Sequence, residues 1–155
     1  MRSLLLTIVC LAALAYSALA ATTGPATAPA SQPAAKLTIT VKDLRNHKGD
    51  LIFGVFKQAD GFPSTKDKSI NWQVKPAADG VEFTAKLAPG KYAASVLHDE
   101  NRNGKMDNDA VGVPVEGYGV TNNPKPKFRG ATFKEATFDL PPQGATLTIS
   151  LQYFR

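Results

Sequence analysis

Apolar and polar residues alternate with a period of two along most of the chain, and turn-forming residues separate the alternating segments. Residues 146–153, TLTISLQY, show this best, with every second side chain apolar. This period predicts strands that bury one face, and no segment after residue 35 keeps a helical period with caps. The expected strands are residues 37–41, 51–56, 71–74, 81–87, 92–98, 133–140 and 147–153.

Seven short strands joined by hairpin-length turns indicate an all-β protein. We expect a seven-stranded antiparallel Greek-key β-sandwich of the immunoglobulin or prealbumin-like kind. A small closed barrel is the alternative. Residues 99–131 form the one long excursion between the expected strands.

The first 20 residues differ from the rest. A basic Arg2 precedes an apolar run that ends in the small residues of Ala18-Leu19-Ala20, which is typical of a cleavable signal peptide. A retained membrane anchor is the alternative, but the run is short and no charged stop-transfer cluster follows. Cys10, inside this run, offers no lipid-attachment site. We therefore expect cleavage, no membrane insertion afterwards, and a periplasmic or secreted protein.

Residues 21–35, ATTGPATAPASQPAA, contain nothing that builds a core and predict a flexible linker. The folded domain is then expected over residues 36–155, as a monomer. Cleavage removes the only cysteine, so this domain has no disulfide despite an oxidising compartment. Loss of Arg2 lowers the formal net charge from +5 to +4, which is too mild an excess to indicate nucleic-acid binding.

One segment, HDENRNGKMDND at residues 98–109, has the spacing of a calcium loop. Alternate Asp and Asn side chains can converge on one point, and the glycine that follows them permits a left-handed turn around the ion. Calcium takes six to eight oxygens, so a main-chain carbonyl is expected to contribute through the lysine. The predicted ligands are Asp99, Asn101, Asn103, Lys105, Asp107 and Asp109.

The loop departs from the full calcium pattern at its twelfth position, where Ala110 replaces a bidentate Glu or Asp. Asp109 lies one residue early, and Glu116 lies further on and could fold back. Calcium binding is therefore expected to be weak, on the order of 10⁻⁴ to 10⁻³ M. A bare Asx-rich turn is the alternative. The following loop, residues 112–124, is either a binding surface or a cover for one end of the sandwich.

No catalytic constellation is evident. His98 and Asp99 are adjacent on a strand and point to opposite faces, as do Ser95 and His98. His47 lies in a polar turn. We expect no catalytic residue and no organic cofactor. The alternative is a hydrolase-type enzyme that uses residues 98–118.

Three motifs together resemble a known bacterial family. They are LAPGKY at residues 87–92, HDENxNGxxD at residues 98–107 and GxPxEGYG at residues 112–119. Over residues 36–154 the chain resembles the domain of unknown function 2141 (DUF2141) family. It is also similar to the prealbumin-like sandwiches of carboxypeptidase regulatory domains and to the B-type repeats of bacterial collagen adhesins. The resemblance implies a secreted or periplasmic β-sandwich and supplies no activity.

These observations predict a non-enzymatic module of the cell envelope, with calcium stiffening one end. Its expected partner is an envelope protein, a peptide or a glycan. A structural protein tethered through the linker is a further alternative.

Overall fold

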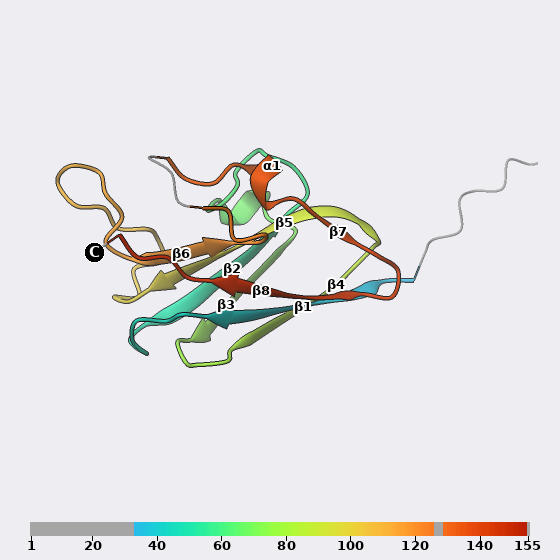
Figure 1. The fold of residues 1–155 in the computed structure, drawn as a ribbon, viewed down its shortest axis with the longest axis horizontal. Helices are drawn as coiled ribbons and strands as arrows, with labels where there is room; N and C mark the ends of the chain where they lie inside the picture. The colour runs from blue at the N-terminus through green and yellow to red at the C-terminus, as the bar shows by residue number, and fades with distance from the viewer. Residues whose placement is uncertain (1–32, 126–128, 155) are drawn as a thin grey trace, which may run out of the picture. The chain divides into compact units, whose positions relative to one another are not determined.

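The computed structural model describes residues 33–125 and 129–154. Within these ranges the chain forms eight strands, one short 3₁₀ turn and one short helix (Figure 1). The elements are β1 (Ala35–Lys42), β2 (Asp50–Phe56), η1 (Lys66–Lys68), β3 (Asn71–Pro76), β4 (Glu82–Leu87), β5 (Gly90–Asp99), β6 (Gly117–Val120), α1 (Phe133–Ala136), β7 (Phe138–Leu140) and β8 (Ala145–Ser150).

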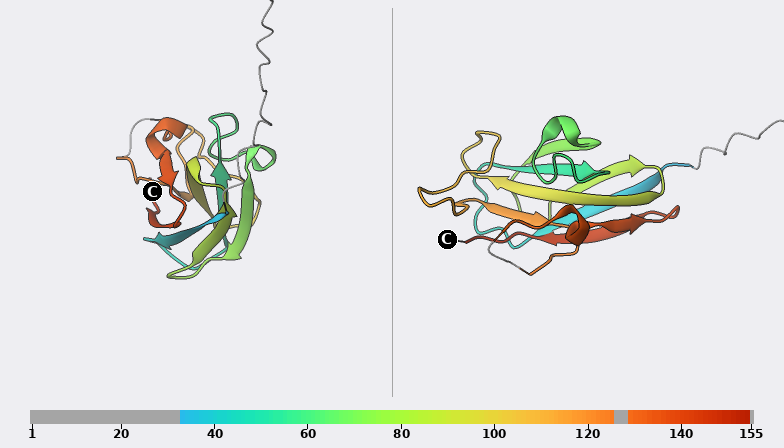
Figure 2. Two further views of the ribbon diagram at one scale, coloured as in Figure 1. Left: turned by 90° about the vertical axis from the view of Figure 1, so that its right-hand side faces the viewer. Right: turned by 90° about the horizontal axis from the view of Figure 1, so that it is seen from above.

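The strands make two sheets that face each other (Figures 1 and 2). The smaller sheet has the order β4-β1-β8, and the larger has the order β3-β2-β5-β6, with β7 also paired to β5. The long β5 spans the larger sheet, because its first residues pair with β7 and its last with β6. The expected all-β sandwich is therefore confirmed.

The core lies between the sheets and follows from the alternation of the strands. β1 buries Leu37, Ile39 and Val41 completely, one side chain in every two. From the larger sheet, the Phe53 ring stacks on the Phe83 ring of the smaller sheet at a centroid distance of 4.8 Å and an interplanar angle of 14°. Burial of a side chain of this size stabilises the fold by roughly 1.5–3 kcal/mol. Packing across the two sheets therefore holds this domain, as its cysteine-free sequence requires.

The two sheets meet along one side, at β6 and β8. Tyr118 N–H donates to the Gln152 carbonyl at 3.0 Å, and Gln152 N–H donates back at 2.8 Å. Glycines make this approach possible: a Cβ on Gly117 would lie 2.1 Å from the Tyr153 ring, and one on Gly119 would lie 2.5 Å from the Ile149 side chain. On the opposite side, Gln73 of β3 reaches β4 only through its side chain, so the described strands form a sandwich joined at one seam.

The strand count differs from the expected seven. Residues 133–140 were expected as one strand, but Thr132 and Glu135 form a capping box that starts α1, and only Phe138–Leu140 is a strand. β6 lies inside the expected long loop, where its two glycines weaken the strand signal. The arrangement is not wholly antiparallel either, because β1 and β8 pair in parallel. The expected signal peptide and most of the linker lie outside the described residues.

Candidate functional site

The Asx-rich loop, the predicted calcium loop of residues 99–109, begins where β5 ends. Both carboxylate oxygens of Asp99 accept main-chain N–H groups, one from Asn103 at 3.0 Å and one from Gly104 at 2.7 Å. Gly104 has a φ of +79°, the left-handed conformation that the motif predicted. The Asp99 residue is only 2% exposed. This carboxylate therefore closes the first turn of the loop from a buried position.

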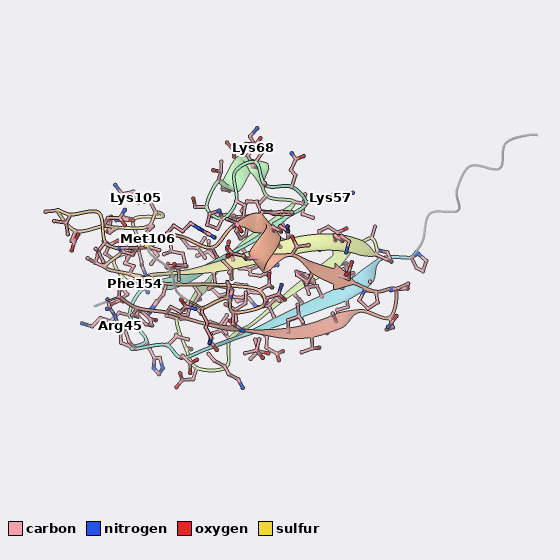
Figure 3. All side chains as sticks on the ribbon, turned by 45° about the horizontal axis from the view of Figure 1, so that its top comes forward. Arg45, Lys57, Lys68, Lys105, Met106 and Phe154 are labelled. Carbon is pink, nitrogen blue, oxygen red and sulfur yellow. The ribbon has the colours of Figure 1, made fainter. Side chains whose placement is uncertain are left out.

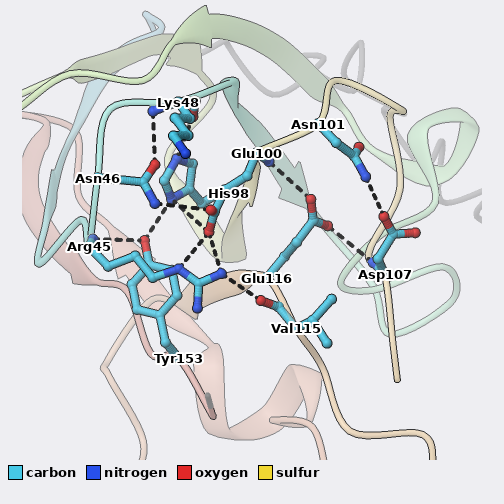
Figure 4. Close-up of polar contacts among 10 residues, drawn as sticks. All are labelled: Arg45, Asn46, Lys48, His98, Glu100, Asn101, Asp107, Val115, Glu116 and Tyr153. Carbon is cyan, nitrogen blue, oxygen red and sulfur yellow. Dashed lines mark hydrogen bonds and ion pairs between the residues drawn. The ribbon is translucent and has the colours of Figure 1, made fainter. Parts of the chain in front are cut away.

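A second carboxylate joins the same cluster. One Asp107 oxygen accepts from the Asn101 amide at 2.6 Å (Figure 4). The same oxygen accepts from the Asn103 amide at 2.7 Å. The structure thus brings together the side chains of Asp99, Asn101, Asn103 and Asp107, which the sequence spacing predicted as ligands. The side-chain oxygens of Asp99, Asn101 and Asn103 and one oxygen of Asp107 accept hydrogen bonds within the loop.

Glu116 folds back onto this loop. Its carboxylate accepts N–H groups from Glu100 at 3.0 Å and from Asp107 at 3.1 Å (Figure 4). Burial raises its pKa, and the neighbouring charges of Asp99 and Asp107 raise it further, against the two main-chain hydrogen bonds, which lower it. The residue is 3% exposed. The charges of Asp99 and Asp107 therefore act on a third carboxylate, that of Glu116.

The other two predicted ligands have different surroundings. Lys105 donates its main-chain N–H to the Asn103 side-chain oxygen at 3.0 Å. Asp109 accepts the N–H groups of Val111 at 3.0 Å and of Val113 at 2.9 Å, so its carboxylate organises the next turn. Within the part of the chain that the structure describes, no three His, Cys, Asp or Glu side chains are arranged together so that they could hold a metal ion.

A clamp ties the Asx-rich loop to the β1–β2 connection. Arg45 donates to the Glu100 carboxylate at 2.7 Å and to the Val115 carbonyl at 2.7 Å (Figure 4). Its guanidinium also lies 4.7 Å from the centre of the Tyr153 ring. The Glu100 carboxyl loses solvation by burial, which alone would raise its pKa, but hydrogen bonds from Asn46 and Arg45 outweigh this and the pKa is lowered.

His98 is fully buried beneath this clamp. Its Nε2 donates to the Lys48 carbonyl at 2.7 Å, because a carbonyl can only accept, and its Nδ1 is hydrogen-bonded to the Tyr153 hydroxyl at 2.7 Å. Ser95 instead donates its hydroxyl to the Pro63 carbonyl at 2.6 Å. His98 is thus bonded to Tyr153 and Lys48, and neither Asp99 nor Ser95 is its partner.

The outer face of the larger sheet is hollowed into a cleft of about 680 Å³. Strand residues form its floor, and the loops around residues 63–64, 104–114 and 129–130 form its walls. The Trp72 ring packs close to Gly54 on this face, and the Tyr118 and Phe154 rings stack at a centroid distance of 5.8 Å. The apolar lining includes Ile52, Trp72, Leu97, Met106, Val113 and Tyr118.

The sequence pattern did not predict this cleft or the Arg45 clamp. The cleft had one local signal: residues 51–56 are almost wholly apolar, which indicates a strand covered on both faces. The clamp had no local signal, because Arg45, Glu100 and Tyr153 are far apart in the chain.

The family of the chain follows from a comparison with known families. The family described as "Uncharacterized protein conserved in bacteria (DUF2141)" matches residues 39–148. The chain belongs to the DUF2141 family. The matched segment of this DUF2141 protein contains the whole Asx-rich loop, Glu116 and most of the cleft lining, but not Phe154.

No curated protein and no solved structure matches the chain. Across the described ranges, no helix is both long and apolar enough to cross a membrane.

Proposed function

We propose that this DUF2141 protein is an exported, non-enzymatic binding module of the cell envelope that holds a small apolar ligand in its outer-face cleft. The observation that carries the proposal is the cleft itself. Its volume of about 680 Å³ and its apolar lining match the usual range for small-molecule sites, roughly 300–1,000 Å³. A standard protein–protein interface is instead broad and rimmed by polar groups.

Calcium is the second part of the proposal. Burial and then the charges of Asp99 and Asp107 raise the pKa of the Glu116 carboxyl, and a bound cation would relieve the repulsion that these charges exert on it. An ion here would stiffen residues 104–114, the loop that forms one wall of the cleft. Both asparagine amides would have to turn an oxygen toward the ion.

Export is proposed from the sequence pattern of residues 1–20, with residues 21–35 as a tether. An extracellular or periplasmic location is consistent with a weak calcium loop. We further propose a monomer with Greek-key, prealbumin-like connections between its eight strands.

The enzyme alternative receives less support. His98 is fully buried with both ring nitrogens bonded, and the Glu116 oxygens are bonded to main-chain N–H groups. A general base has to reach a substrate proton within hydrogen-bond distance. His98 and the Glu116 carboxylate are thus engaged in bonds within the protein, whereas the lining of the cleft is mainly apolar.

The cleft is tested with N-phenyl-1-naphthylamine, an uncharged dye whose emission rises in apolar sites. The chain should give a saturable rise in emission, and Leu97→Asn on the cleft floor should weaken it about tenfold. Val74→Asn is the matched control, because Val74 is 53% exposed on the same sheet and does not line the cleft. Absence of saturable binding would contradict the proposal.

The calcium part is tested separately by calorimetry and thermal unfolding at about 10⁻³ M calcium. Binding heat and a rise in melting temperature are expected. Asp99→Ala should abolish both, whereas Asp67→Ala, an exposed acidic residue in η1, should change neither. If the native chain shows no heat and no shift, the calcium part is wrong while the cleft part stands.

A further inference from the structure

The charged side chains that line the cleft have one sign, although acidic residues such as Asp107 and Glu135 lie nearby in the same segments. Its lining contains two charged residues, Lys105 and Arg129, and no Asp or Glu among the residues that the structure describes. Both are cations, so an anionic group would be attracted to the mouth and a cationic one repelled.

The two cations are not equivalent. The Arg129 guanidinium forms a bidentate pair with Glu135, at 2.9 and 3.0 Å, so a negative charge already lies beside it. Lys105 is exposed, and the described residues give its ammonium no hydrogen bond and no ion pair. Figure 3 shows Lys105 beside Met106 and Phe154 at one end of the domain, where apolar lining and free charge come together.

The polar groups of the lining limit what can be buried there. The Ser95 hydroxyl is already donated to Pro63, and most other lining side chains are apolar. A glycan buried in this cleft would leave hydroxyls without partners, which costs several kcal/mol. An alkyl chain or a ring without polar substituents has no such penalty. The cleft therefore favours a ligand with an apolar body and a charged end.

We propose that the ligand is a single-chain amphiphilic anion, such as a fatty carboxylate, whose chain lies on the floor formed by Ile52 and Leu97 and whose anionic end pairs with the Lys105 ammonium. This inference rests on the proposed function, because it names the chemical class of the ligand of the same cleft. It adds that recognition depends on charge as well as on apolar area.

The chain supplies its own reporter. Trp72 is the only tryptophan and lines the cleft, so a brominated ligand that enters the cleft quenches its emission on contact. Three probes of equal chain length separate charge from apolarity: 12-bromododecanoate, 12-bromododecanol and 12-bromododecyltrimethylammonium. All are titrated below their micelle concentrations, with and without calcium.

The carboxylate is expected to quench at roughly fivefold lower concentration than the alcohol, with the ammonium weakest. Lys105→Met keeps an unbranched side chain but removes the charge. It should therefore remove the preference for the carboxylate and leave the affinity for the alcohol unchanged. Lys105→Glu should reverse the order of the two ions. Lys86→Glu, the same charge change at an exposed lysine of β4 in the other sheet, should leave the order as it is.

Each other result decides against the inference. Equal affinity for the carboxylate and the alcohol, or a carboxylate preference that survives Lys105→Glu, overturns it while the proposed function stands. If none of the probes quenches Trp72, both fail. Quenching by vesicles of brominated phosphatidylglycerol but not by the monomeric probes would mean that the cleft face contacts a lipid surface, and would also overturn it.

Discussion

The two faces of β5 both carry apolar side chains, but the surroundings of these side chains differ. Its inward side chains, such as Val96, are sealed by the opposite sheet, whereas Leu97 on the outer face is half-buried under loops that leave a hollow. Both faces carry apolar residues, but those of the inward face are the more completely covered. The comparison indicates that apolar residues of the sealed face contribute mainly stability, while those of the open face are available to a ligand.

The largest effect is expected on the sealed face. Phe53→Ala removes a fully buried ring from its stack with Phe83 and should lower the free energy of unfolding by about 3–5 kcal/mol. Urea denaturation followed by circular dichroism measures this change. A cost below about 1 kcal/mol would mean that the two faces do not differ as the comparison requires.

The next largest effect on stability is expected where the two sheets meet, between β6 and the residues after β8. Gly117→Ala places a Cβ 2.1 Å from the Tyr153 ring, so the ring or the strand has to move, at a cost of roughly 1–3 kcal/mol. Gly130→Ala is the control, since a Cβ there meets nothing within 4 Å. Equal melting temperatures for the two variants would show that the seam tolerates crowding.

The free energy of unfolding should depend on pH through Glu100, the carboxylate that Arg45 holds. Its folded pKa is lowered from 4.5, so its stabilising contribution is complete above that value and is lost as the pH falls through the folded pKa. Glu100→Gln should cost roughly 1–2 kcal/mol near neutrality, and its difference from the native chain should shrink as the pH falls below 4.5 through the folded pKa. Unfolding titrations in that range measure it; a difference that grows in acid would reverse the assigned sign.

The smallest effect on stability is expected on the open face. Leu97→Ala should cost only about 1 kcal/mol, because the side chain is half-buried, but it should weaken the binding of an uncharged dye several-fold. Dye titration and urea denaturation of the same sample separate the two effects. A large loss of stability with unchanged dye binding would place Leu97 in the core rather than in a binding site.

Individual elements show which parts of the fold the sequence predicts and which parts it does not. The alternation of Leu37, Ile39 and Val41 predicted β1 because a half-buried strand repeats every two residues. The Thr132–Glu135 capping box is also present in the sequence, but the apolar residues of 133–140 predict a strand instead. β6 could not be read locally, because its glycines are explained only by the Tyr153 and Ile149 side chains that pack against them.

The candidate site was likewise predictable only in part from the sequence. The spacing of Asp99, Asn101, Asn103 and Asp107 determined that these side chains meet, since a loop of nine residues with a left-handed glycine brings its own members together. Whether calcium joins them stays a prediction. The position of Glu116 agrees with the expectation that it folds back, but its buried state depends on packing.

The sequence by itself determined the strand-rich class, most strand positions and the Asx-rich turn, because each rests on residues a few positions apart. Only the tertiary structure decided the parallel pairing of β1 with β8, the Arg45 clamp and the cleft. These depend on side chains from distant segments, such as Ile52, Leu97 and Phe154, that become neighbours when the sheets pack. A local pattern states which residues are apolar, whereas packing decides which apolar surface remains uncovered.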